Sequence, residues 1–398
     1  MSRAAIVCCL VLTACEGELI GVRPPLTTPP SLVAPTELVP PSRTVQAPQT
    51  PLAEVRATVS GAQAVAFARR VAPMLIGRVP TPDELARLSM GGGTALRELL
   101  EAWTTEPGFA EAARDWISVK LKASGSGGGI DGDLPGNLAA YLVKNGRPHA
   151  ELLTAQRCYG RDGAPRACDT GAPFTAGVLT TRAFLKNTAS RFNLKRARTV
   201  VKTFACSDYP MDHALQPPIE RERLIPLFQV DQTNDSSAGT FGNGHACYAC
   251  HSQFSAHAQP FVKFDDQGRY QANATGLQDP ALEQGRSTAS LFTSHFTGAA
   301  AASEQSQIFG QQVQNLAEAA RVISSSRLYL ECSARSFSGY VLALSESEAN
   351  ALPADVVSEA VSEALARSSQ PTLASLVVEL FSHPSMMQAR RPGLTVTP

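Results

Sequence analysis

The sequence predicts a mainly α-helical fold, and two long stretches of the chain carry that prediction. Between residues 53 and 124, and again between 305 and 390, apolar side chains recur every three or four positions, the spacing of one helix face. The segment Thr81-Pro82-Asp83-Glu84 adds a strong helix start, with a Thr cap, Pro at the first helical position and acids in the first turn. These two stretches are therefore expected to be helical modules on either side of the central part of the chain.

The first module, residues 53–124, is expected to contain several helices. One carries apolar residues from Ala64 to Leu75, and a second starts at Pro82. Three consecutive glycines, Gly91-Gly92-Gly93, are expected to end that second helix, with Thr94 opening another. Trp103 and Trp116 are expected to be core aromatic residues of this module.

The amino terminus has the pattern of an export signal. A short basic start is followed by an apolar run from Ala4 to Ala14, which is too short to span a bilayer as a permanent helix. The run ends in Leu12-Thr13-Ala14-Cys15, which resembles the bacterial lipobox, and this resemblance implies cleavage before Cys15 and diacylation of its sulfur. Residues 1–14 are therefore expected to be a lipoprotein signal peptide. The alternative is an ordinary secretory signal with incidental cysteines.

Residues 15–52 are expected to be a tether between the lipid and the folded part. Prolines recur throughout this stretch and aromatic residues are almost absent, a composition that favours extended segments and cannot bury a core. A lipid anchor holds a folded domain at a membrane without spanning it. The expected location is the bacterial cell envelope, facing the periplasm or the exterior, with the outer membrane favoured. The formal net charge is zero and no long basic cluster is present, so nucleic acid is not an expected partner.

The central part of the chain contains one motif with a specific chemistry, Cys247-Tyr248-Ala249-Cys250-His251. This C-x-x-C-H pattern is the attachment site of a c-type haem, in which the two thiols form thioethers with the porphyrin and His251 is the proximal iron ligand. C-x-x-C also serves redox dithiols and zinc knuckles. A zinc site would need a further distant ligand, because Cys247, Cys250 and His251 are too close together to form a tetrahedron. Haem c is therefore the expected cofactor.

Export implies an oxidising compartment, where the remaining cysteines are expected to form disulfides. The chain has nine cysteines, of which Cys8 and Cys9 lie in the signal, Cys15 is the lipid site, and Cys247 and Cys250 belong to the haem motif. Four then remain, and they allow three connectivities. The favoured one joins Cys158 to Cys168 across a turn-rich stretch and Cys206 to Cys332. The alternative is four unpaired buried thiols.

Several stretches resemble a planctomycete-type cytochrome c-like multidomain family, whose domains have no assigned function and carry a C-x-x-C-H motif. The stretch 70–84, ending in Gly77-Arg78-Val79-Pro80-Thr81-Pro82-Asp83-Glu84, is similar to the family's LTGRxPTPEE signature. The stretch 177–185 (GVLTTRAFL) is similar to the family's GLLTxxAFL, and a basic helix ending at Cys206 follows it. Twelve residues then separate His251 from Phe264-Asp265-Asp266-Gln267-Gly268-Arg269-Tyr270, as in the family's FDxxGRYR pattern.

This resemblance implies how the rest of the chain is organised. Residues 136–300 would form a small cytochrome c-like haem-bearing region, and residues 305–390 a carboxy-terminal helical module that packs behind it. The fold class expected for the whole chain is mainly α, with helical modules flanking the haem domain. One departure is clear: the family's Asp-Pro-x-Gly-Phe is replaced here by residues 255–261 (SAHAQPF), which places the distal side of the haem in question.

The second axial ligand of the iron is left open by the sequence. The candidates are Met211, His245, His257, His295, His383, Met386 and Met387, among which His257 and His295 lead. His257 lies six positions after His251, and on one continuous helix the two side chains would point away from each other, so coordination needs a tight loop. Lys263 and Arg269 are candidate partners of the haem propionates. Asp265 is expected to cap its own turn, and His149 to lie on a helix surface.

The expected function is that of a membrane-anchored monohaem c-type cytochrome-like protein that transfers electrons to a redox partner protein of unknown identity. One alternative is a haem enzyme of peroxidase-like or oxidative type. Bacterial di-haem peroxidases need two haem motifs and this chain has one, and it lacks G-x-S-x-G and H-E-x-x-H motifs. The other alternative is a non-redox scaffold or binding lipoprotein.

Overall fold

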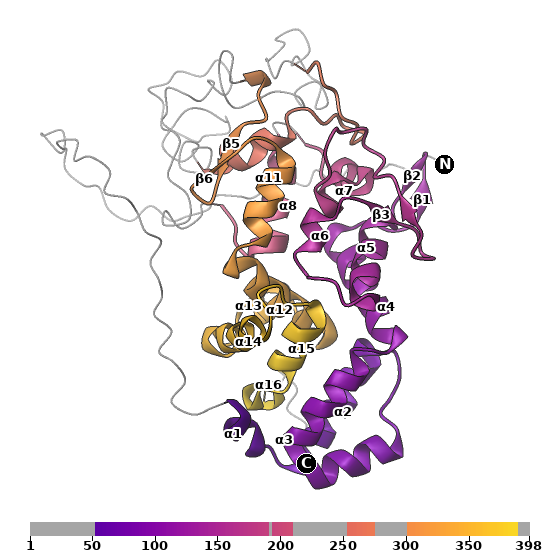
Figure 1. Ribbon diagram of the computed structural model, residues 1–398, viewed down its shortest axis with the longest axis vertical. Coiled ribbons are helices and arrows are strands. Elements are labelled where there is room, and N and C mark those ends of the chain that lie inside the picture. The colour runs from indigo at the N-terminus through magenta and orange to yellow at the C-terminus, as the bar shows by residue number, and fades with distance from the viewer. Residues whose placement is uncertain (1–51, 191–192, 210–252, 275–300, 389–398) are drawn as a thin grey trace, which may run out of the picture. The chain divides into compact units, whose positions relative to one another are not determined.

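The computed structural model describes residues 52–190, 193–209, 253–274 and 301–388 of the chain (Figure 1). Within these ranges the protein is mainly helical, as the sequence predicted, and its strands are short. None of the helices in these ranges combines the length and the apolar character needed to cross a membrane.

The helices fall into an amino-terminal, a central and a carboxy-terminal group. They are α1 (Leu52–Ala57), α2 (Gly61–Leu75), α3 (Pro82–Trp103), α4 (Pro107–Leu121), α5 (Leu134–Lys144), α6 (Glu151–Thr154), η1 (Gly177–Thr180), α7 (Arg182–Asn187), α8 (Leu194–Ala205), η4 (Gln259–Phe261), α11 (Leu316–Ser324), α12 (Arg327–Val341), α13 (Glu346–Asn350), α14 (Ala354–Arg367), α15 (Leu373–Phe381) and α16 (Pro384–Gln388). Residues 253–258 are also helical and lead directly into η4.

The described strands pair as three small antiparallel hairpins on the helical scaffold. The pairs are β1 (Ser126–Gly127) with β2 (Ile130–Asp131), β3 (Cys158–Tyr159) with β4 (Pro165–Arg166), and β5 (Ser306–Ile308) with β6 (Gln311–Val313). In the last pair Ile308 faces Gln311, so a two-residue loop joins β5 to β6. This hairpin lies beside α11, at the upper end of the view in Figure 1.

Side-chain caps fix where the amino-terminal helices begin. Ser60 and Gln63 form a capping box at the start of α2. Thr81 and Glu84 form another at α3, where Pro82 occupies the first helical turn, as predicted. Such caps satisfy backbone N–H groups that have no partner within the helix, and a good cap contributes about 1 kcal/mol.

The prediction that the three glycines end one helix and that another follows was confirmed. Two helical segments meet at a kink within α3 (Pro82–Trp103), because the φ of 55° and ψ of −134° of Gly92 are not helical. A Cβ atom on Gly92 would lie 2.3 Å from the carbonyl oxygen of Val59, and one on Gly93 would lie 2.2 Å from that of Arg56. The glycines are therefore needed because the end of α1 passes directly over the helix at this point.

The hydrophobic core connects the two ends of the chain. Phe67 of α2 meets Phe381 of α15 edge-on at 5.7 Å between ring centroids, and Trp116 of α4 meets Phe337 of α12 at 5.3 Å. Trp103 and Trp116 are both buried, as predicted. One continuous cluster of buried apolar residues takes side chains from the described parts of all three predicted regions, 53–124, 136–300 and 305–390.

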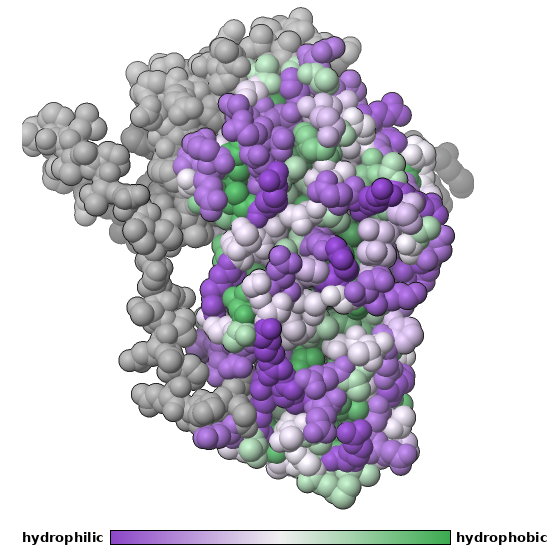
Figure 2. Space-filling view, viewed as in Figure 1, coloured by the Kyte–Doolittle hydropathy of each residue, from purple (hydrophilic) through white to green (hydrophobic). Residues whose placement is uncertain are grey.

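The surface of the described residues is mixed in character. Figure 2 shows hydrophilic and hydrophobic side chains alternating on the face drawn, with green confined to separate small areas. The large hydrophobic residues that are exposed are Met74, Val79, Met90 and Val119. Scattered residues of this kind are normal on a folded protein and do not by themselves mark a binding surface.

Candidate functional site

The haem motif itself lies outside the described residues. This holds for Cys247, Cys250 and His251, and equally for the proposed lipid site Cys15 and the candidate ligand His295. The described chain resumes at Gln253, two positions after His251, so the site is built here from the residues that follow the motif.

Residues 253–262 form a fully buried segment directly after the motif. The hydroxyl of Ser306, on β5, donates to the carbonyl oxygen of Ala256 at 2.5 Å. The side-chain amide of Gln259 donates to the carbonyl oxygens of Ala301, at 3.3 Å, and Ser303. The helical turn that follows the motif is thus fixed to the β5–β6 hairpin and to the residues just before it.

A buried histidine of this segment, His257, is paired with the partly buried Tyr209. The hydroxyl oxygen of Tyr209, three residues after Cys206, is 2.7 Å from Nδ1 of His257. His257 is 4% exposed, and its other ring nitrogen, Nε2, is buried without a hydrogen-bond partner. The pair therefore presents one buried ring nitrogen whose hydrogen-bonding capacity is not used by the protein.

Aromatic side chains surround this pair. Phe254 packs edge-on against Tyr209 at 5.5 Å, and Phe309 packs edge-on against His257 at 5.8 Å. Phe309 and Gly310 form the two-residue loop of the β5–β6 hairpin with φ values of 48° and 79°. Two consecutive positive φ values are typical of the tight hairpin turns that match strand twist. A phenylalanine in the left-handed region of backbone conformation costs about 1 to 2 kcal/mol. The turn holds the Phe309 ring against His257.

Burial keeps both partners of the pair neutral. It lowers the pKa of His257 from 6.5 to about 3 and raises the pKa of Tyr209 well above its ordinary value. The phenol then holds one proton, and among the described residues Nδ1 of His257 is the hydrogen-bond partner of its oxygen. Donation from Tyr209 to Nδ1 satisfies that proton and leaves the imidazole proton on Nε2. Nε2–H is therefore a buried donor that lacks an acceptor.

Two features bear on His257 as a candidate iron ligand. An imidazole binds a metal through an unprotonated nitrogen, and donation from the Tyr209 hydroxyl to Nδ1 would leave the ring proton on Nε2. Residues 253–258 are helical, so the chain advances only about 1.5 Å per residue there.

The turn after this segment is tied to the helices that precede the motif. Asp265 Oδ1 accepts from the backbone N–H groups of Gln267, at 2.9 Å, and Arg269, at 2.7 Å, which is the capping role predicted for it. The fully buried guanidinium of Arg196, on α8, donates to the carbonyl oxygens of Phe264, at 2.7 Å, and Asp265, at 2.5 Å. It also donates to the carbonyl oxygen of Leu185 at the end of α7. One cation thus joins the 177–185 stretch, the basic helix and the F-D-x-x-G-R-Y turn.

The two candidate propionate partners, Lys263 and Arg269, lie beside and within the F-D-x-x-G-R-Y turn. Lys263 Nζ donates to the carbonyl oxygens of Ala272, at 3.0 Å, and Ala274. Arg269 is exposed to solvent. The lysine therefore closes a local turn.

The four remaining cysteines are joined in the connectivity that the sequence favoured. Cys158 is bonded to Cys168 around the β3–β4 hairpin, and Cys206 is bonded to Cys332 of α12. The Cys206–Cys332 bond closes a loop of the chain that contains the haem motif. It attaches the start of that loop to the carboxy-terminal helices. Tyr209 lies three residues inside this loop.

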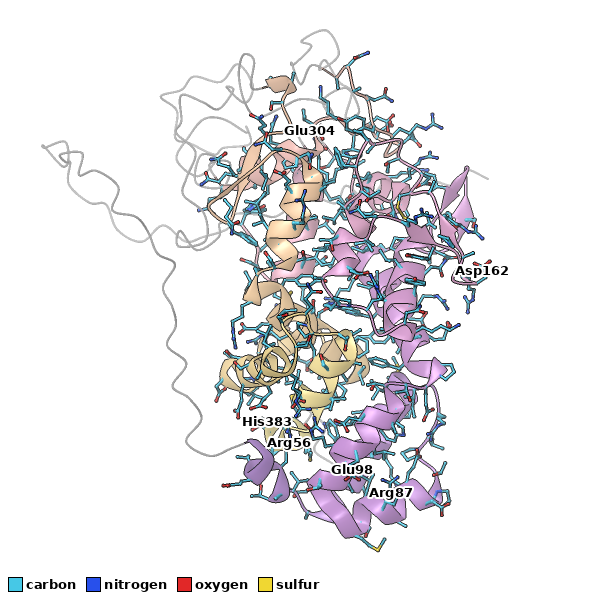
Figure 3. The ribbon with its side chains drawn as sticks, in the orientation of Figure 1. Arg56, Arg87, Glu98, Asp162, Glu304 and His383 are labelled. Carbon is cyan, nitrogen blue, oxygen red and sulfur yellow. A yellow bond between two sulfur atoms is a disulfide. The ribbon has the colours of Figure 1, made fainter. Side chains whose placement is uncertain are left out.

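The other described candidates for the second axial ligand have different neighbours. His383 Nε2 lies 3.5 Å from Glu359 Oε2, and its Nδ1 accepts from the backbone N–H of Ser385, so both ring nitrogens are engaged. Figure 3 places His383 beside Arg56. Met386 is buried in the hydrophobic core and Met387 packs against it. Met211 and His245 lie outside the described residues.

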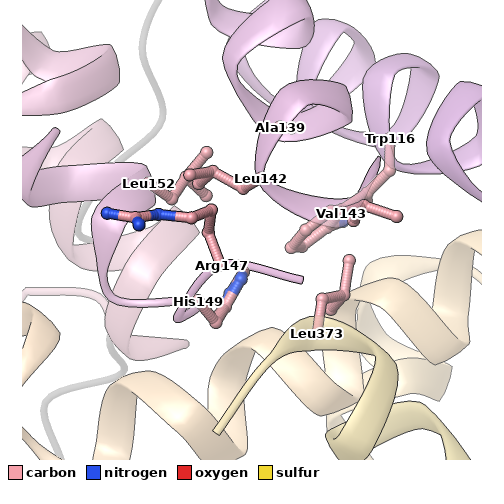
Figure 4. A pocket seen from close by; sticks show the side chains of 8 residues that line it. All are labelled: Trp116, Ala139, Leu142, Val143, Arg147, His149, Leu152 and Leu373. Carbon is pink, nitrogen blue, oxygen red and sulfur yellow. The ribbon is translucent and has the colours of Figure 1, made fainter. Parts of the chain in front are cut away.

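A second buried histidine lies in a small pocket between α4, α5, α6 and α15 (Figure 4). His149 was expected on a helix surface, and this was wrong: it is 4% exposed and stacks between Trp116, at 6.1 Å, and Tyr329, at 5.1 Å. Burial lowers its pKa to about 3, and its Nε2 has no hydrogen-bond partner. The remaining pocket residues are mostly apolar: Ala139, Leu142, Val143, Arg147, Leu152 and Leu373. Within the described residues, no group of three or more His, Cys, Asp or Glu side chains could hold a metal ion.

No family model, curated protein or solved structure matches the chain. The resemblance to the planctomycete-type family therefore stays a prediction that rests on the motifs quoted above.

Sequence reasoning missed Tyr209 and Phe309. Both act on His257 through contacts between residues far apart in the chain, at separations of 48 and 52 positions. The Phe309-Gly310 dipeptide between two short polar stretches carries only a weak turn signal. Nothing in the local sequence indicates that the tyrosine would lie against the histidine.

Proposed function

We propose that this protein is a lipid-anchored monohaem c-type cytochrome-like protein, in which a haem bound covalently to Cys247 and Cys250 transfers electrons. His251 would bind the iron as proximal ligand. The haem supplies a one-electron redox centre, and the protein supplies its attachment, its surroundings and access for a redox partner. Cys15 would carry the lipid that holds the protein at a membrane of the bacterial cell envelope.

The observation that carries this proposal is the pairing of the other cysteines. Cys158, Cys168, Cys206 and Cys332 are consumed by two disulfides. Disulfides of this kind suit an oxidising compartment, which is also where a signal sequence would deliver the chain. Apart from the three cysteines assigned to the signal and the lipid, the thiols left over are those of the C-x-x-C-H motif.

The described residues next to the motif fit a haem. The segment after His251 is buried and contains two phenylalanines, Phe254 and Phe261, and an apolar shell excludes water from a haem and tunes its potential. The same segment holds a buried N–H donor, His257 Nε2–H, without an acceptor in the protein. Donation from Tyr209 to Nδ1 would leave His257 in the tautomer that cannot coordinate iron, so we propose His295, the other leading candidate, as the second axial ligand.

The attachment chemistry is tested on the exported full-length chain by denaturing electrophoresis followed by haem staining. Covalent haem survives denaturation, so a stained band at the mass of the protein is expected. Cys247→Ser and Cys250→Ser should weaken or abolish the stain. Cys158→Ser is the matched control, because it removes a cysteine of the same chain outside the motif and should leave the stain intact. Absence of the stain from the unaltered protein would refute the proposal.

A further inference from the structure

We infer that His257, oriented by Tyr209, is a binding residue for a haem propionate, to which its Nε2–H group donates a hydrogen bond. This inference rests on the proposed function, since it requires a haem at the neighbouring motif. It deepens that proposal by assigning a role to the one buried ring nitrogen beside the motif that the protein leaves without a partner.

The first step is the cost of the buried donor. An N–H group without an acceptor in a protein interior costs about 1 to 3 kcal/mol, so such groups are rare unless a ligand satisfies them. His257 Nε2 is buried and has no partner, while Nδ1 is held by the Tyr209 hydroxyl at 2.7 Å. The side chain is also clamped by the Phe309 ring at 5.8 Å, so it cannot readily turn to find another acceptor.

The second step is the chemistry of the missing partner. The group must accept a hydrogen bond, because the hydrogen bond from Tyr209 leaves the ring proton on Nε2. The strong acceptors on the periphery of a haem are its two propionate carboxylates. A hydrogen bond from a neutral donor to an ionised carboxylate is shorter and stronger than one between neutral groups. The same protonation of Nε2 excludes coordination of the iron by that nitrogen.

The third step is reach. Four residues of helix add about 6 Å between residues 253 and 257, and the two preceding residues add at most about 7 Å. The path along the chain from His251 to His257 is therefore at most about 13 Å. His257 can approach the haem edge without crossing to the distal face. Of the two cations considered as propionate partners, Lys263 already donates to backbone carbonyl oxygens and Arg269 is exposed.

The test compares haem-loaded His257→Phe, His257→Gln and His149→Phe with the unaltered full-length protein. The readouts are the resonance Raman bending mode of the propionates and the reduction potential measured by spectroelectrochemistry. Removing the donor in His257→Phe should shift the propionate mode and lower the potential, because the uncompensated carboxylate favours ferric iron. His257→Gln keeps an N–H donor and should restore both values in part. His149→Phe is the matched control, since His149 is also buried with an unsatisfied Nε2, and it should change neither.

The outcomes separate this inference from the proposed function. An unchanged propionate mode and potential in His257→Phe would overturn the inference while leaving the haem assignment intact. Loss of the low-spin absorption spectrum in His257→Phe would also overturn it, and would identify His257 as an iron ligand instead. A protein without haem would overturn both. If His257→Phe does not fold, Tyr209→Phe gives the same test. Its expected shift in propionate mode and reduction potential is smaller, because the imidazole stays but is no longer held in one orientation.

Discussion

The hydroxyl of Tyr209, a partly buried residue, lies 2.7 Å from Nδ1 of the buried His257. Tyr209 lies three residues after Cys206, which is bonded to Cys332. The contact therefore joins the start of the loop closed by this disulfide to the helical turn that follows the haem motif. With the hydroxyl as the donor, the imidazole proton lies on Nε2. The chemistry proposed for the site depends on that assignment.

Tyr209→Phe is expected to destabilise the protein by about 1 kcal/mol, the usual net contribution of one hydrogen bond. The ring stays, so its edge-on packing against Phe254 is retained and the change isolates the hydroxyl. Urea denaturation followed by circular dichroism measures the difference. Tyr141→Phe, at a stacked pair with Tyr159 near the surface, is a control expected to have a smaller effect. Equal effects of the two changes would contradict a specific role for the Tyr209 hydroxyl.

His149 is expected to make the protein less stable at mildly acidic pH. Its pKa is about 3 in the folded chain and 6.5 in the unfolded chain, so below pH 6.5 the unfolded chain binds a proton that the folded chain refuses. Stability should therefore fall as the pH decreases, by about 1.4 kcal/mol per pH unit for each such histidine. Between pH 6.5 and 5 His257, whose pKa is also lowered to about 3, should contribute in the same way, so a variant is needed to isolate the effect of His149. Glu84, whose pKa is lowered to about 2 by Arg78, begins to lose its stabilising contribution only at lower pH.

The measurement is urea denaturation at several pH values in this interval for the unaltered protein and for His149→Phe. Phenylalanine can stack between Trp116 and Tyr329 but does not titrate. The unfolding free energy of His149→Phe should therefore depend less steeply on pH, because its unfolding takes up about one proton fewer. Parallel curves for the two proteins would show that His149 is not buried as a neutral ring.

Glu379→Gln is expected to destabilise the fold by about 3 to 5 kcal/mol. The Glu379 side chain is 1% exposed and pairs with the buried Arg56 of α1, and also with Arg97 at 2.9 Å and Arg367 at 3.1 Å. Removing its charge leaves a buried arginine without a counter-ion. Thermal denaturation monitored by circular dichroism measures the loss.

The control for this prediction is Glu98→Gln. Glu98 pairs with Arg87 at 3.4 Å, and both side chains are more than half exposed. Figure 3 labels both residues. Exposed pairs of this kind contribute at most about 1 kcal/mol. If the two changes destabilise the protein equally, the buried pair does not hold α1 in place.

Gly93→Ala is expected to displace α1 from the kink of α3, because its Cβ would lie 2.2 Å from the carbonyl oxygen of Arg56. Overpacking of this kind costs about 1 to 3 kcal/mol. Trypsin cleavage after Arg56 should become faster, since this buried arginine would be released. Gly127→Ala is the control, as a Cβ there meets no atom within 4 Å. Unchanged cleavage in Gly93→Ala would contradict the close packing of α1 on this glycine.

The sequence allowed the helical elements to be predicted where the determining interactions are local. Thr81 and Glu84 are three residues apart, and their capping box follows from residue types alone. The break at Gly92 was also predicted, because three consecutive glycines are a local helix-ending signal. The close approach of the Val59 carbonyl oxygen to Gly92 was not predicted, because it is a contact between residues far apart in the chain.

In the candidate site, too, interactions between residues close in the chain were predicted, and interactions between distant residues were missed. The capping role of Asp265 was predicted because its partners lie within four residues of it. The burial of His149 was missed because Trp116 and Tyr329, which stack on it, come from helices far away in the chain. The role of Tyr209 was missed for the same reason.

The central claim is that Cys247, Cys250 and His251 hold one covalently bound haem, and the pyridine haemochrome spectrum of the exported, full-length protein tests it most directly. The account predicts the reduced spectrum of a haem with both vinyl groups saturated, at one haem per chain, retained after acid–acetone extraction. A chain that is exported and folded but has no haemochrome absorbance, or that loses its haem to the extraction, would contradict it.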